Sequence, residues 1–88
     1  MTFNEDKNGN VTISYEDYGS PSGFDYECTY KLDSGNAGKL NDYLRSIGRE
    51  GTLREMIAQE FGEELKRKSF SAELDRQSIK YERFIWES

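Results

Sequence analysis

Two stretches in the first third of the chain alternate between apolar and polar residues. The apolar and aromatic members are Val11, Ile13 and Tyr15 in one stretch, and Phe24, Tyr26, Cys28, Tyr30 and Leu32 in the other. A period of two with β-branched and aromatic side chains predicts half-buried strands. The letters GSPSG between them are typical of a turn. The pattern therefore predicts a β-hairpin over residues 11–18 and 23–32.

Residues 2–10 leave two alternatives open. The segment is polar and could form a frayed arm. It could also form a short strand around Phe3 that turns back through Lys7–Asn10, because the Asn-Gly pair in this segment suits a tight reversal.

The next segments have helical periodicity. Leu40, Leu44 and Ile47 recur at i, i+4 and i+7 before Gly48, which predicts a first helix capped by Ser34 or Asn36.

Thr52 and Glu55 form a capping box, which predicts the start of a second helix. Its apolar stripe is Leu53, Ile57, Phe61 and Leu65, and Lys66, Arg67 and Lys68 close it in accord with the helix dipole. This helix contains Gly62, which destabilises a helix interior by about 1 kcal/mol relative to alanine.

The C-terminal region is ambiguous. Residues 71–77 favour a short third helix with Phe70 and Leu74 facing inward, and residues 79–86 favour a strand. A single helix over residues 71–86 is the alternative. Trp86 and Phe84 are interpreted as core residues, although an exposed tryptophan near a chain end would suit an interface.

These elements predict one α+β domain over residues 1–88. A small antiparallel sheet contains the N-terminal hairpin and the C-terminal strand, and two or three helices pack on one face of it. The C-terminal strand is expected to pair with an edge of the hairpin and so protect that edge.

Composition narrows the functional classes. Apolar residues make up 34% of the 88 residues and aromatic residues 14%, so a core rich in tyrosine and phenylalanine is expected. The net charge is −5, and the excess lies in residues 1–44, which hold eight acids and three bases. This balance argues against direct binding to nucleic acid or to an anionic membrane, and it favours basic protein partners.

The residues that usually carry catalysis are sparse. The chain has no histidine, and its single cysteine, Cys28, alternates with inward-facing tyrosines, which indicates a small buried side chain. Gly35–Lys39 lacks the spacing of a phosphate loop. Asp25 and Glu27 lie on an open strand without an enclosing cleft, so we expect a non-enzymatic protein with no cofactor and no metal site.

The outer face of the hairpin carries the main candidate site. Matching the inner faces places Glu16 opposite Asp25 with Glu27 on the diagonal, and a shift of two residues places Glu16 opposite Glu27 instead. Directly opposed like charges destabilise a sheet, by about 0.2–1 kcal/mol. Asp17 and Tyr18 extend the same region. The crowding has three interpretations: a solvated face, a surface that a basic partner completes, or a site for a hard cation, for which the sequence has no matching ligand spacing.

We therefore expect an acidic protein-interaction module. It would present Glu16, Asp17, Tyr18, Asp25 and Glu27 to a basic protein surface, and it would act as an inhibitor where that surface normally binds nucleic acid. The alternative is a structural or self-associating domain that uses the sheet edge or residues 84–86.

Two further expectations complete the prediction. Glu60, Glu63 and Glu64 form a second acidic patch, interpreted as a solvated helix face with Glu63–Arg67 and Glu64–Lys68 pairs. Without a signal sequence or an apolar run that could span a bilayer, we expect a cytoplasmic protein.

Overall fold

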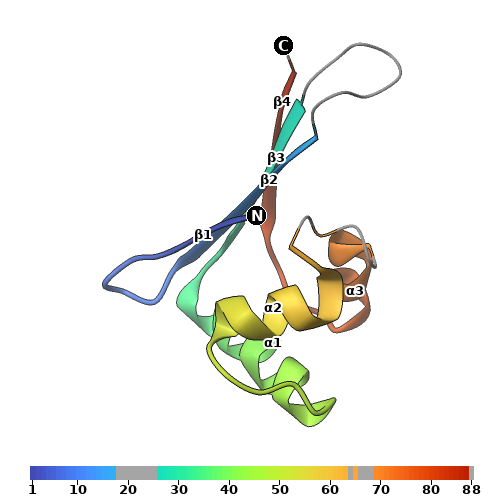
Figure 1. Ribbon diagram of the computed structural model, residues 1–88. Coiled ribbons are helices and arrows are strands. Elements are labelled where there is room, and N and C mark those ends of the chain that lie inside the picture. The colour runs from blue at the N-terminus through green and yellow to red at the C-terminus, as the bar shows by residue number, and fades with distance from the viewer. Residues whose placement is uncertain (18–25, 64, 66–68, 88) are drawn as a thin grey trace.

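The computed structural model describes residues 1–17, 26–63, 65 and 69–87 (Figure 1). Its strands are β1 (Thr2–Glu5), β2 (Val11–Asp17), β3 (Tyr26–Leu32) and β4 (Glu82–Glu87), and its helices are α1 (Ser34–Ser46), α2 (Leu53–Phe61) and α3 (Phe70–Arg76). The fold is α+β, as predicted. None of the helices in these residues is long and apolar enough to cross a bilayer.

The strands form one antiparallel sheet in the order β1-β2-β3-β4. The chain leaves the sheet after β3, forms the three helices, and returns as β4 beside β3. The predicted C-terminal strand is confirmed, although it begins at Glu82 rather than at residue 79, and the alternative of a single helix over residues 71–86 is wrong. Figure 1 shows the helices gathered around one end of the sheet, while β2, β3 and β4 extend beyond them.

The polar N-terminal segment forms a strand rather than a frayed arm. β1 is joined to β2 by a turn in which the Asp6 carboxylate accepts hydrogen bonds from the backbone N–H groups of Asn8 and Asn10, at 2.8 and 3.0 Å. Gly9 has φ +85°, and a Cβ there would lie 3.1 Å from Cβ of Ser34. The turn therefore needs glycine both for its backbone conformation and for its approach to α1.

The register of the β2–β3 hairpin differs by two residues from the first expectation. Ile13 lies opposite Tyr30, and Tyr15 lies opposite Cys28. A shift of two residues keeps every side chain on its predicted face, so the alternation in the sequence is compatible with either register. The predicted pairing of Glu16 with Asp25 is wrong, and the alternative pairing with Glu27 is the one observed.

The residues that cap the N-termini of α1 and α2 agree only in part with the predicted ones. Asp33, rather than Ser34 or Asn36, caps α1, because its carboxylate accepts from the backbone N–H of Asn36 at 2.8 Å. The capping box of Thr52 and Glu55 at the start of α2 is confirmed.

The prediction that the second helix continues past Gly62 is wrong. α2 ends at Phe61, and Gly62 is its C-cap with φ 84°. Glycine adopts this conformation without steric strain, so Gly62 ends the helix and its expected penalty in a helix interior does not arise. Leu65, also at positive φ, is buried beyond the helix rather than within it.

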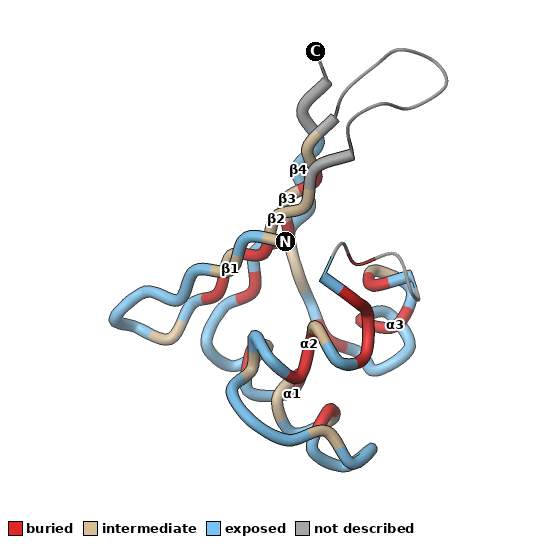
Figure 2. The backbone as a smooth tube through the Cα atoms, in the orientation of Figure 1, coloured by how far each residue is buried: buried red, intermediate tan, exposed pale blue. Residues whose placement is uncertain are grey.

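The core lies between the helices and the inner face of the sheet, the face to which Val11, Ile13, Cys28 and Tyr30 belong. Figure 2 shows buried segments on the helices and on the strands that they face. Phe70 joins the two layers, because its ring packs edge-on against Tyr30 and Phe61 at centroid distances of 5.0 and 4.9 Å. The predicted burial of Cys28 is confirmed.

Candidate protein-interaction surface

The face of the sheet that points away from the core is called here the outer face. Because residues alternate along each strand, the register defines three rows of residues that cross this face. The rows are Thr12–Lys31–Glu82, Ser14–Thr29–Phe84 and Glu16–Glu27–Trp86.

The rows differ in their charge. Lys31 is in register with Glu82, so one row joins opposite charges. Ser14 and Thr29 share a hydrogen bond of 3.0 Å between their hydroxyl oxygens. In the last row, however, Glu16 lies directly opposite Glu27. Among the described residues, Glu27 forms no ion pair.

The structure brings only some of the five residues predicted for partner binding together. Glu16 and Glu27 meet on the outer face, as the second register required. Asp17 occupies a position in register with Tyr26, which belongs to the inner face, so the backbone does not place Asp17 in the same row as Glu16. Tyr18 and Asp25 lie outside the described residues.

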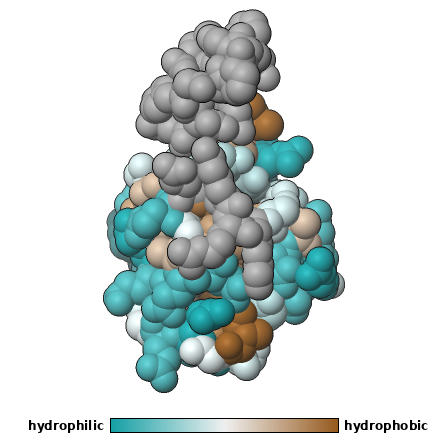
Figure 3. All heavy atoms as spheres, turned by 45° about the vertical axis from the view of Figure 1, so that its right-hand side comes forward, coloured by the Kyte–Doolittle hydropathy of each residue, from teal (hydrophilic) through white to brown (hydrophobic). Residues whose placement is uncertain are grey.

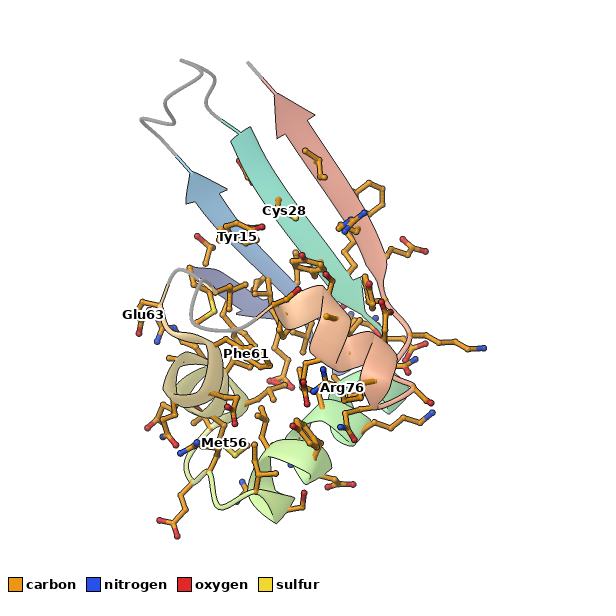
Figure 4. The ribbon with its side chains drawn as sticks, turned by 90° about the vertical axis from the view of Figure 1, so that its right-hand side faces the viewer. Tyr15, Cys28, Met56, Phe61, Glu63 and Arg76 are labelled. Carbon is orange, nitrogen blue, oxygen red and sulfur yellow. The ribbon has the colours of Figure 1, made fainter. Side chains whose placement is uncertain are left out.

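The row that contains Glu16 and Glu27, called the acidic row below, lies at one end of the sheet. It lies near the end of the sheet that projects beyond the helices, which pack near the opposite end (Figure 4). Tyr15 and Cys28, labelled in Figure 4, mark the level of β2 and β3 immediately before this end. Among the described residues, no helix packs against the sheet at this level.

The edge strand β4 carries exposed apolar side chains. Phe84 is 43% exposed and Ile85 is 54% exposed. On the face drawn in Figure 3, most of the coloured atoms are hydrophilic and hydrophobic atoms form small patches. Phe84 lies on the outer face, where Nζ of Lys31 is 5.2 Å from its ring centroid, a cation–π distance.

The interpretation of Phe84 as a core residue is wrong. Its row faces away from the helices, and β4 has a sheet neighbour on one side only among the described residues. The sequence contains a strand signal but no signal for which strand lies at an edge. The side chain of Trp86, for which the same interpretation was made, lies outside the described part of the structure.

The second acidic patch is not a uniformly solvated helix face. Glu60 is buried, with 4% of its surface exposed, and its Oε2 lies 3.4 Å from Nε of Arg49. Glu63 pairs with Arg54 at 3.1 Å. Both predicted i, i+4 pairs required a continuing helix, which ends at Phe61, and the other residues of those pairs, Glu64, Arg67 and Lys68, lie outside the described residues.

Sequence analysis also missed the role of Glu73. This buried residue of α3 accepts a hydrogen bond from Oη of Tyr43 at 2.5 Å and another from Arg76 at 2.9 Å. The hydrogen bond to Glu73 raises the pKa of Tyr43 to about 12, and burial adds to the effect. Tyr43 therefore stays a neutral donor near neutral pH, and the three residues connect α1 to α3.

A polar depression lies between the β1–β2 turn, α1 and the start of β4. Its amide groups are engaged in the fold: Oδ1 of Asn10 accepts from the Ser34 backbone at 3.1 Å, and Oδ1 of Asn36 accepts from the Lys80 backbone at 2.8 Å. Hydrogen bonds from backbone amides lower the pKa of both Asp6 and Asp33. These groups hold distant segments together, so their arrangement already has a structural explanation.

Comparisons of the chain with family models, with curated proteins and with solved structures find no match. The functional interpretation therefore depends on the surface itself.

Proposed function

We propose that this protein is a non-enzymatic interaction module that presents the acidic row of its outer face to a basic surface on another protein. The observation that carries the proposal is the register that places Glu16 directly opposite Glu27. Two carboxylates held side by side on a sheet repel each other, and a partner that supplies lysine or arginine would turn this repulsion into attraction.

The distribution of charge supports a protein partner over nucleic acid. The net charge of −5 would repel a phosphate backbone and would speed the encounter with a basic protein. Where the basic surface is itself a nucleic-acid-binding surface, the carboxylates would take the places of phosphates. The module would then act as a competitive inhibitor.

The test compares two doubly neutralised variants with the same net charge. One carries Glu16→Gln and Glu27→Gln on the outer face. The matched control carries Asp42→Asn and Glu63→Gln, two exposed acids of the helical part of the molecule. Each variant and the parent protein are immobilised, and a partner captured from native cells is quantified at several salt concentrations.

The proposal expects the outer-face variant to lose most of the partner while the control retains it. It also expects binding of the parent protein to weaken as salt rises, because screening reduces attraction between exposed charges. Equal recovery with both variants would contradict the proposal, since net charge alone, or a different surface, would then account for binding.

A second candidate function is self-association. The observation that favours it is the exposure of Phe84 and Ile85 on the edge strand β4. Exposed apolar residues on a sheet edge favour the addition of another strand.

A further inference from the structure

The open edge of β4 has the properties of a pairing surface. β3 occupies one side of β4, and none of the described residues forms a strand on its other side (Figure 4). An edge strand presents backbone N–H and C=O groups that another strand can pair with. Natural edges are commonly protected by charge, by proline or by a bulge. β4 has charged residues at Glu82, Arg83 and Glu87, but its middle exposes Phe84 and Ile85.

We propose that β4 pairs with β4 of a second copy of this chain, antiparallel and centred on Ile85. This inference deepens the second candidate function above, self-association, and rests on it. In the proposed register Ile85 lies opposite Ile85 of the second copy. Arg83 lies opposite Glu87 of the second copy, and Phe84 lies opposite Trp86, and each of these pairs occurs twice by symmetry.

The charge pattern of β4 selects this register. Opposite charges and aromatic pairs that face each other across neighbouring strands are stabilising, and like charges are destabilising. A shift by one residue in one direction places Glu82 opposite Glu87 of the second copy, so that like charges meet. In the other direction it places Phe84 opposite Glu87, and Arg83 loses its partner on β4. A shift by two residues places Arg83 opposite Ile85 or Ile85 opposite Glu87, and the ion pair is lost. Centring on Ile85 joins Arg83 to a carboxylate.

The fold accommodates the arrangement. Ile85 is in register with Cys28, so it belongs to the inner face of the sheet. Residues that lie opposite each other on neighbouring strands share a face, so pairing Ile85 with Ile85 of the second copy places the helices of both copies on the same side of one continuous sheet. The twofold axis closes the assembly, and β1 of each copy becomes its outer edge. β1 is short, and Thr2, Asn4 and Glu5 are exposed and polar, so further growth is disfavoured.

The outer face of the assembly gains a second feature. The cation–π contact between Lys31 and Phe84 lies beside the junction, so the aromatic pair of the two copies extends an existing cluster. The acidic row lies on the same face, and the dimer would present two copies of it to a partner.

Sedimentation equilibrium with charge-exchange variants tests the register. Arg83→Glu and Glu87→Arg should each weaken the dimer by about tenfold or more, because either change sets like charges against each other at two symmetric positions. An equimolar mixture of the two variants should form a heterodimer, since every pair in it again joins opposite charges. The double variant Arg83→Glu with Glu87→Arg should dimerise like the parent chain.

Ile85→Lys provides an independent variant at the twofold axis. The side chain is more than half exposed, so the fold should tolerate the substitution, which circular dichroism checks. This variant should be monomeric. A parent protein that stays monomeric up to roughly 1 mM overturns the proposal. The proposal is also overturned if Arg83→Glu and Glu87→Arg leave the dissociation constant of the dimer unchanged, or if the parent protein forms a series of higher oligomers.

The outcomes distinguish this inference from the partner-binding proposal. Glu16→Gln with Glu27→Gln should leave the dimer intact, because neither residue lies on β4. A monomeric Ile85→Lys variant that still captures the basic partner would leave the main proposed function standing. Loss of capture together with loss of dimerisation would show that both surfaces act together.

Discussion

The acids of the helical layer and the acids of the outer face are arranged in opposite ways. Glu73 lies between Tyr43 and Arg76, and Glu60 lies beside Arg49. On the outer face, the strand register places Glu16 opposite Glu27. The two acids of the helical layer therefore each have a hydrogen-bond or ion-pair partner within the chain, whereas the register of the sheet sets one acid against another.

The contrast supports the proposal that the outer face binds a partner. Interactions that selection keeps for folding are satisfied within the chain, because an unpaired buried charge is strongly destabilising. A pair of like charges that destabilises the isolated molecule is not explained by folding, and binding to a partner of opposite charge would explain it. Substitutions at four positions test whether the two regions differ as described.

The largest effect is expected for Glu73→Ala. The change leaves the Tyr43 hydroxyl and the Arg76 guanidinium without their shared acceptor, and we expect the free energy of unfolding to fall by about 1–3 kcal/mol. Urea denaturation measures this. Glu63→Ala is the control, because its ion pair with Arg54 is exposed and should contribute little. Equal losses of unfolding free energy in Glu73→Ala and Glu63→Ala would show that the contacts of Glu73 contribute no more to stability than an exposed ion pair.

Tyr43→Phe should have a smaller effect with a characteristic pH dependence. Loss of the hydrogen bond should destabilise the protein by about 1 kcal/mol at neutral pH. Folding raises the pKa of Tyr43 from 10.0 to about 12, so this residue stabilises the fold below pH 10, and its contribution is lost as the pH rises to 12. Melting temperatures measured from pH 8 to 12 should fall less steeply in the variant. A residual slope is expected because burial also raises the pKa of Tyr30 and Tyr81.

Asp33 should confer acid sensitivity at the start of α1. Its hydrogen bond from the Asn36 backbone lowers its pKa below 3.8, so Asp33 stabilises the fold above that pH and loses its contribution as the pH falls. Asparagine is also a good N-cap. Asp33→Asn should therefore keep the stability at pH 7 and flatten the acid transition, whereas Asp33→Ala should lose stability at pH 7. Thermal melts at pH 7 and pH 3 distinguish the two.

The smallest effect, and the only gain, is expected for Glu27→Gln. Removing one of two opposed carboxylates should stabilise the protein by about 0.2–1 kcal/mol at low salt, and the gain should shrink as salt rises. Glu82→Gln is the matched control, because it removes a carboxylate opposite Lys31 on the same face and should cause a small loss. Chemical denaturation at two salt concentrations measures both. A lower free energy of unfolding for Glu27→Gln would contradict this prediction, because it would show that the repulsion between Glu16 and Glu27 is already compensated within the protein.

Much of the fold could be predicted because its signals are local. Alternation along residues 11–17 and 26–32 determines which side chains face the core, and Thr52 with Glu55 marks the start of α2. The role of Gly62 could not be predicted from the sequence, because a glycine can interrupt a helix or end it, and only the path of the following residues decides between these outcomes. The candidate site was partly predictable, since both acceptable registers placed Glu16 opposite a carboxylate.

The roles of Glu60, Glu73 and Phe84 could not be predicted from their neighbours in the sequence. The ion-pair partner of Glu60 is Arg49, and Glu73 binds Tyr43 on another helix. Their burial depends on how α1, α2 and α3 pack. Phe84 looks like a core residue in a strand pattern, and it is exposed because β4 is an edge strand whose row faces away from the helices.

The sequence by itself determined the element types, the two faces of the hairpin and the excess of acids in the first half of the chain. These properties depend on side-chain period, capping chemistry and charge, which act over a few residues. Only the tertiary structure decided the register, the edge position of β4 and the choice between paired and opposed carboxylates. Each of these depends on contacts between residues far apart in the chain, which a local pattern does not encode.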